Sequence, residues 1–247
     1  INPKLLSDEL HEIGGNEANV ATGYHAIEFL LWGQDLNGTE KGSGDRKYTD
    51  FSIENCTNDN CDRRREYLLA ASELLIEDLN YIQNAWGKSG EARLDILNDK
   101  NNAVKRILIG MGSLSYGELA GERMKLGLML HDPEEEHDCF SDNTHNSHYY
   151  NVVGISNVYK GQYKRLNGEL ISGPSISNLV KNIDKKLDKE TNKSINNTLK
   201  DMLVIVKSAN KGTTYDMLIA ENNTEGNQLI QNAVDSLVLQ SKKIERV

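Results

Sequence analysis

Proline is scarce in this chain of 247 residues, which holds only three. Proline interrupts helices, and long segments of the chain repeat apolar residues at helical spacing. The sequence therefore predicts an all-α protein. It also lacks any apolar run near the roughly 20 residues that a membrane-spanning helix needs. We expect no such helix within it.

Basic residues are in the minority, with 28 Lys and Arg against 37 Asp and Glu, and the formal net charge is -9. Such a surface repels a polyanion, which argues against nucleic acid as a partner. An initiator Met is also missing, because the chain begins at Ile1 with neither a basic nor an apolar leader. We expect that a start has been removed or left out. Any membrane attachment would then use an unseen N-terminal anchor.

Cysteine occurs three times, and two of the three lie close together. Cys56 and Cys61 flank a short polar segment that a disulfide could close, and Cys139 is left over. The alternative is three free thiols in a reducing cytosol. We favour the local disulfide and an oxidising compartment, because this polar composition offers little other reason for two cysteines.

Helical periodicity and turn residues divide the chain into segments. Helices are expected at residues 19–32, 61–86, 175–184, 188–209 and 224–243, with a glycine-interrupted helical region at 91–130 and a short helix at 147–159 within a loose connection. Asn167-Gly168 is the sequence of a two-residue hairpin turn. The expected fold is thus one or more helical bundles with at most one small β-hairpin, at residues 162–172.

One helix carries two metal-ligand side chains. His25 and Glu28 are three residues apart, so they share a face of the helix at 19–32. Apolar residues surround nearly the whole helix, which predicts that it is buried. A buried carboxylate is costly unless it is paired or bound to a metal. Either Glu28 pairs with an Arg, or both side chains bind a metal. The metalloprotease patterns His-Glu-x-x-His and His-x-x-Glu-His are absent.

Two further carboxylates interrupt an apolar stripe in the glycine-rich region. Glu118 and Glu122 fall on the same helical face as Met111 at a period of 3.6 residues. In one interpretation they form ion pairs with Arg123 or Lys125. In the other, Glu122 completes a mixed His and carboxylate site of the kind found in helical iron proteins.

The segment 131–148 holds four of the six histidines. Its acidic run at 134–136 is expected to be a solvated surface run. Asp142 and His145 are the better ligand candidates, because neighbouring aromatic residues would let this part of the segment turn inward. A long connection of this kind is typical of a functional loop.

Three blocks of sequence resemble the imelysin family, whose signature is Gly-x-His-x-x-Glu. They are residues 23–35, 112–123 and 136–145, and the resemblance extends to about residue 209. The family includes iron-regulated protein A and an insulin-cleaving membrane protease. Membership implies helical bundles in a protein of the bacterial periplasm, outer membrane or cell surface, where an outer-membrane lipoprotein would carry an N-terminal anchor.

The resemblance also implies ligands and a division of the chain. His25 and Glu28 would be the core ligands, with Glu122, or less favourably Glu118, as a third. Asp50 matches a recurring family block, although Lys47 stands where the family usually has Pro. Family members carry a long helical segment before the signature. Residues 1–50 would therefore belong with a missing N-terminal helical region, and residues 51–247 would form a C-terminal bundle domain.

Two functions are consistent with these residues. The favoured one is an extracytoplasmic metal-binding protein that captures a divalent cation, with iron preferred to zinc, and acts in iron acquisition with other uptake components. The alternative is a metallopeptidase of the imelysin type, in which a metal activates water and Glu28 or Glu122 acts as general base. One compact ligand pair without a recognisable base motif favours binding.

Overall fold

The computed structural model describes residues 1–16, 19–99 and 101–247, and most of them are helical. The chain forms two compact units. The N-terminal unit comprises Ile1–Leu36 and Gly42–Lys100, and the C-terminal unit comprises Asn37–Lys41 and Asn101–Val247. The sequence predicts a division near residue 50, whereas the units divide near residue 100. None of the described helices has the length and apolar character that crossing a bilayer requires.

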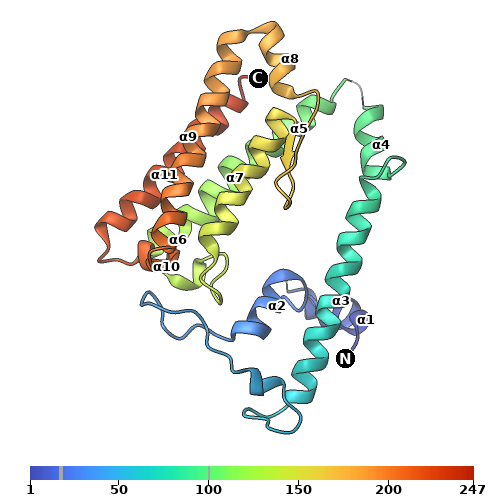
Figure 1. Ribbon diagram of the computed structural model, residues 1–247, viewed down its shortest axis with the longest axis vertical. Helices are drawn as coiled ribbons and strands as arrows, with labels where there is room; N and C mark the ends of the chain where they lie inside the picture. The colour runs from blue at the N-terminus through green and yellow to red at the C-terminus, as the bar shows by residue number, and fades with distance from the viewer. Residues whose placement is uncertain (17–18, 100) are drawn as a thin grey trace. The chain divides into compact units, whose positions relative to one another are not determined.

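The N-terminal unit is built around one long helix (Figure 1). Its elements are α1 Pro3–Leu5, the π-helical turn η1 Leu6–Leu10, the 3-10 turns η2 Ile13–Gly15 and η3 Tyr48–Phe51, and helices α2 Gly23–Trp32, α3 Cys61–Ala85 and α4 Glu91–Asn98. Helix α3 packs against α2, α1 and η3, which is why residues 51–99 group with the N-terminal residues. The small core gathers Leu6, Ala70 and Ala71.

Helix α2 begins four residues later than predicted, at Gly23, and ends at the expected glycine, Gly33. The prediction that this helix is buried all round is wrong. Ala26 and Leu30 are buried, but Tyr24 and Leu31 are 64% and 43% exposed. Helix α2 packs against α3 with one face only, and it has more apolar residues than this face can hold. The remaining apolar residues stay accessible.

The C-terminal unit is a helical bundle in which α9 packs against α7, α8 and α11 (Figure 1). Its helices are α5 Ala103–Ser113, η4 Leu114–Lys125, α6 Leu126–Leu130, η5 Pro133–Glu135, α7 Thr144–Lys160, α8 Ile176–Ile183, α9 Lys185–Ala209, α10 Tyr215–Ile219 and α11 Thr224–Ile244. The inner face of α11 contains Ile230, Ala233 and Leu237, which are fully buried. The short helix that the sequence predicts at 147–159 is the longer, 17-residue helix α7.

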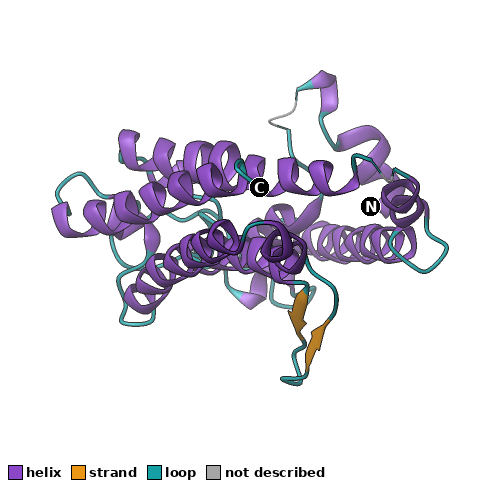
Figure 2. Ribbon diagram, turned by 90° about the horizontal axis from the view of Figure 1, so that it is seen from above, coloured by secondary structure: helices purple, strands orange, loops and turns teal. Residues whose placement is uncertain are grey.

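The predicted hairpin is confirmed, and it is the one sheet among the described residues (Figure 2). Strands β1 Gln162–Lys164 and β2 Leu170–Ser172 run antiparallel, with Gln162 opposite Ser172. Gly168 takes a φ of 88°, which glycine adopts without strain. The all-α prediction with one small hairpin therefore describes the fold.

The glycine-rich region is one helical run that changes its winding. Between α5 and α6, the segment η4 is a π-helix, whose hydrogen bonds reach back five residues; the Leu126 N–H donates to the Gly121 carbonyl. A π-helix has more residues per turn. The buried residues of η4 are Ser115, Leu119, Ala120 and Met124, and those of successive turns are four or five residues apart. A spacing of 3.6 therefore does not identify its inner face.

Candidate metal centre

His25 and Glu28 lie together on α2. The His25 Nδ1 is 2.9 Å from the Glu28 Oε2. The Glu28 side chain is 10% exposed, whereas the His25 ring is 40% exposed. The pair thus joins a buried carboxylate to an imidazole with an accessible edge.

Several contacts fix the start of α2. Gly23 has a φ of 84°, which turns the chain into the helix. The Tyr67 hydroxyl of α3 donates to the Ala21 carbonyl at 2.8 Å, and the Ala21 N–H donates to the His11 Nδ1 at 3.3 Å. His11 therefore acts in positioning this segment, a role that the sequence did not indicate. These bonds hold the turn that carries His25.

The geometry of the pair suits metal chemistry. A carboxylate that bonds one imidazole nitrogen sets the tautomer and orientation of the ring, and proteins use this arrangement to direct the other nitrogen toward a metal. With Glu28 on Nδ1, the nitrogen in question is the Nε2 of His25. The same two residues can also supply one nitrogen and one oxygen ligand directly. Either arrangement requires both side chains.

Asp50 is buried in a hydrogen-bond network at η3. Its Oδ1 accepts bonds from the Thr57 hydroxyl at 2.5 Å and the Asn58 amide at 2.8 Å, and its Oδ2 pairs with Arg46 at 3.3 Å. Arg64 donates to its backbone carbonyl at 2.7 Å. Both carboxylate oxygens thus have protein partners, an arrangement that accounts for the buried charge without a metal.

Glu118 and Glu122 lie on the exposed face of η4. Arg123 donates from its Nη2 to the Glu118 Oε2 at 3.0 Å, which is the ion pair that one interpretation of the sequence expects. The wide winding of η4 turns both carboxylates away from the apolar core of the unit. Glu118 and Glu122 therefore do not lie in the core of the C-terminal unit.

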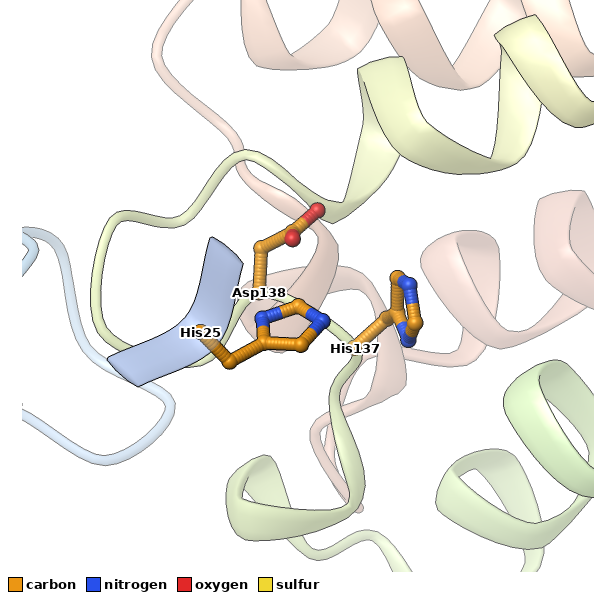
Figure 3. A group of neighbouring side chains, drawn as sticks. All are labelled: His25, His137 and Asp138. Carbon is orange, nitrogen blue, oxygen red and sulfur yellow. The ribbon is translucent and has the colours of Figure 1, made fainter. Parts of the chain in front are cut away.

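The loop before α7 contains buried acids, which the sequence did not suggest. Glu136, Asp138 and Asp142 are all buried, so at least the last residue of the run at 134–136 is not a surface acid. Figure 3 labels His137 and Asp138 on this loop and His25 on α2. The Thr144 hydroxyl accepts a bond from the Asp138 N–H at 2.7 Å, and the Ser147 hydroxyl donates to the Asp138 Oδ2.

The histidines of this region have different environments. The His131 Nδ1 lies 2.6 Å from the Ile219 carbonyl, a partner that anchors the end of α6. His145 is half-buried, and this burial lowers its pKa. His148 is fully buried, and its pKa is held well below the usual value by burial first and by neighbouring positive groups second. Both of these rings are therefore neutral at pH 7.

His148 and Asp216 are two further buried polar residues of the C-terminal unit that sequence reasoning missed. His148 falls in one helical stripe with Val152, Ile155 and Tyr159, which a 3.6-residue period could have revealed. Asp216 follows Tyr215 in the short helix α10, whose other residues are mostly apolar. A carboxylate within such an apolar segment was the signal that could have indicated a buried acid at Asp216.

Cys56 and Cys61 are joined by a disulfide, with an S–S distance of 2.00 Å. The bridge closes the polar loop between η3 and α3. Cys139 takes no part in a disulfide. Thr57 and Asn58, which bind Asp50, lie inside the closed loop. The bridge therefore constrains the segment that supplies these two bonds.

Helical packing with a His and carboxylate pair on α2 defines an all-α protein with a candidate metal centre. The sequence profile of the imelysin family, also labelled peptidase M75, matches residues 1–244. The chain therefore belongs to the imelysin family.

One solved structure shows the same fold. It is from Parabacteroides distasonis and is described as an iron-regulated protein A precursor. It is 18% identical to this chain, with a TM-score of 0.68, and the match covers 98% of this chain and 67% of the other. No curated protein matches. The solved structure supports the fold, and the family profile supports the resemblance found in the sequence.

Proposed function

We propose that this protein binds a divalent metal ion through His25 and Glu28, that the ion is iron, and that the protein serves iron acquisition outside the cytoplasm. The observation that carries the proposal is the 2.9 Å contact between the His25 Nδ1 and the Glu28 Oε2. The mixed nitrogen and oxygen donors suit iron, and zinc is the competing ion.

Two further observations support the proposed location and role. The Cys56–Cys61 bridge is typical of an oxidising compartment such as the periplasm or the cell surface. The Parabacteroides distasonis protein of the same fold is described as iron-regulated and as a precursor. Partners of the protein would be the metal ion and other components of iron uptake.

The second candidate function is peptidase activity, which the family label favours. In that case His25 would hold a metal that lowers the pKa of a water molecule, and Glu28 would accept the proton from that water. The proposal does not include Asp50 or Glu122 among the metal ligands, because both oxygens of Asp50 have protein partners and Glu122 is exposed. We assign Asp50 a supporting role under either function. Its carboxylate pairs with the side chain of Arg46, and the Arg46 backbone N–H donates to the Trp32 carbonyl at the end of α2, at 2.9 Å.

The decisive experiment measures metal affinity by titration for the wild type, His25→Ala, Glu28→Gln and Glu122→Gln. We expect His25→Ala and Glu28→Gln each to weaken binding at this site by about 10- to 100-fold. Glu66→Gln is the matched control, because it makes the same charge change on an exposed side chain of α3. Equal affinities for all variants would refute the proposed ligands. The Glu122→Gln result decides whether this carboxylate contributes.

A cleavage assay on unfolded protein substrates separates the two functions. If the protein only binds metal, neither the wild type nor any variant cleaves. If Glu28 is a general base, Glu28→Gln keeps the metal while turnover falls by about two to four orders of magnitude. Metal-dependent cleavage by the wild type that disappears in metal-loaded Glu28→Gln would replace the binding proposal by the peptidase.

A further inference from the structure

Buried acidic groups gather in the C-terminal unit, where the loop before α7 meets the start of α10. Glu136, Asp142 and Asp216 are 5%, 7% and 1% exposed. The pKa of Glu136 is raised well above its usual value, first by burial and then by the charges of Asp216, Asp142 and Asp138. These carboxyl groups are therefore close enough to repel one another in a place that water hardly reaches.

An imidazole without hydrogen-bond partners lies at the same place. His148 on α7 is 0% exposed, and neither of its ring nitrogens has a hydrogen-bond partner. Its ring centroid is 5.0 Å from that of Tyr215 and 6.0 Å from that of His137. A neutral imidazole has one donor and one acceptor nitrogen. Leaving both unmet inside a protein is rare and requires an explanation, such as a bound ion or water.

Tyr215 connects the imidazole to the acids. The Tyr215 ring contacts His148, and the pKa of its hydroxyl is raised first by burial and then by the charge of Glu136. The Tyr215 hydroxyl and the Glu136 Oε1 are both buried without a hydrogen-bond partner. The other oxygen of Glu136 bonds to Thr144. A carboxylate, an imidazole and a phenol from three segments thus adjoin one another with unmet bonding capacity.

We propose that Glu136, His148 and Asp216 form a second metal site, in the C-terminal unit, for one divalent cation of the iron(II) or manganese(II) class. Two carboxylates and one imidazole are ligands that suit these ions. A cation at this place would offset the mutual repulsion of the acids and give His148 a partner. All the ligands belong to the C-terminal unit, so the proposal does not depend on His25 or Glu28.

The site is wider than a closed coordination sphere. The ligand atoms of Glu136, His148 and Asp216 do not all lie within 4.8 Å of one another. The imidazole is fixed by packing against Tyr215, whereas carboxylates can adjust through their side-chain torsions. Binding therefore requires Glu136 and Asp216 to move toward His148. The Tyr215 hydroxyl would then be a hydrogen-bond donor beside the bound carboxylates.

The test uses the full chain with His25→Ala and Glu28→Gln combined, so that the first proposed site is removed. Manganese(II) and cobalt(II) are the probes, and bound metal is counted by titration. We expect this background to retain one equivalent. Adding Glu136→Gln with Asp216→Asn should weaken binding at least about tenfold, because loss of even an outer-shell partner of a metal ligand costs about that much. Glu134→Gln is the matched control, since Glu134 is an exposed member of the same acid run.

Two readouts guard against misfolded variants. Metal at about one hundred times its dissociation constant should raise the melting temperature of the background by about 5–10 °C, and this shift should disappear with Glu136→Gln. The visible spectrum of bound cobalt(II) should change with His148→Gln. If His148→Gln does not fold, Glu136→Gln decides, because it keeps the shape of the side chain and can still bond to Thr144.

The outcomes are distinct for the two sites. A background that binds no metal refutes the second site, and the unmet groups are then served by buried water. Equal binding by Glu136→Gln and Glu134→Gln refutes it as well. If the wild type loses an equivalent with His25→Ala but none with Glu136→Gln, only the first proposal stands. If the reverse holds, only the second does.

Discussion

Asp50 shows how a single buried carboxylate is stabilised by its neighbours. Its pKa lies below the usual value of 3.8, mainly because of the hydrogen bond from Thr57. Burial opposes this shift, while the Asn58 bond and the charges of Arg64 and Arg46 add to it. A lowered pKa means that ionised Asp50 stabilises the folded state. That contribution is present above pH 3.8 and is lost as the pH falls toward the pKa of the folded state.

Replacing Asp50 should therefore destabilise the N-terminal unit. Asp50→Ala leaves the donors of Thr57, Asn58 and Arg46 without their acceptor, which should cost about 1–3 kcal/mol in the free energy of unfolding at pH 7. Urea unfolding measures this cost. In Asp50→Asn, stability should fall less steeply below about pH 4 than in the wild type. Identical acid profiles would show that the carboxylate does not titrate with folding.

The cysteines give a second prediction. Unfolded protein that has not been reduced should show one reactive thiol, at Cys139, and reduction should raise the count to three. Replacing Cys56 and Cys61 together by Ser should lower the free energy of unfolding by about 2 kcal/mol, because the short loop gains freedom when unfolded. Three thiols before reduction would remove the support for an oxidising compartment.

Local sequence could identify His25 and Glu28 because their spacing alone places them on one helical face. It could not identify the environment of Glu136. Three successive acids are usually solvated, yet Glu136 is buried because the loop before α7 folds over α10. Contacts between segments far apart in the sequence decide this, as the bond between His131 and Ile219, 88 residues apart, illustrates. No period within either segment contains that information.

Among the elements, helix boundaries were predictable where glycine ends the helix. Gly33 ends α2, and Gly161 with a φ of 59° ends α7. The length of α7 was not predictable from its polar first turns, because the packing of α7 on α9 stabilises them. The π-helical winding of η4 was also missed. A period of 3.6 residues placed Glu122 on the inner face, and the wider turn places it outside.

Two glycines within helices should respond oppositely to the same substitution. A Cβ at Gly154 of α7 meets nothing within 4 Å, so Gly154→Ala should stabilise the protein by about 0.5–1 kcal/mol. A Cβ at Gly226 of α11 would lie 2.6 Å from the Leu218 carbonyl. Gly226→Ala should therefore destabilise it by about 1–3 kcal/mol. Thermal unfolding of both variants checks the pair, and equal effects would contradict the packing at Gly226.

At the scale of the whole molecule, composition and periodicity were sufficient to predict an all-α protein. They were not sufficient to group its helices. The family resemblance implied that residues 51–247, and with them α3, form a C-terminal bundle, whereas α3 packs with α2 and α1. An apolar stripe shows that a helix has a partner without showing which one. The grouping became visible only with the contacts.

The far-UV circular dichroism spectrum should accordingly be that of a helical protein, since most of the described residues are helical. Strands contribute only the six residues of β1 and β2 among those described. A spectrum dominated by strands would contradict the fold and the membership of the imelysin family together. The same measurement, followed during heating, reports whether each variant above is folded.

The hairpin offers a practical consequence. Most of its strand residues are exposed, and the bond from the Gly173 N–H to the Gly161 carbonyl closes its base. Backbone with so little burial opens locally and exchanges its amide hydrogens while the helices stay closed. Its tip at Asn167-Gly168 is therefore a place where the chain accepts an inserted peptide, such as an affinity tag or a fluorophore site. A label there would report on the bundle without changing any residue of either proposed metal site.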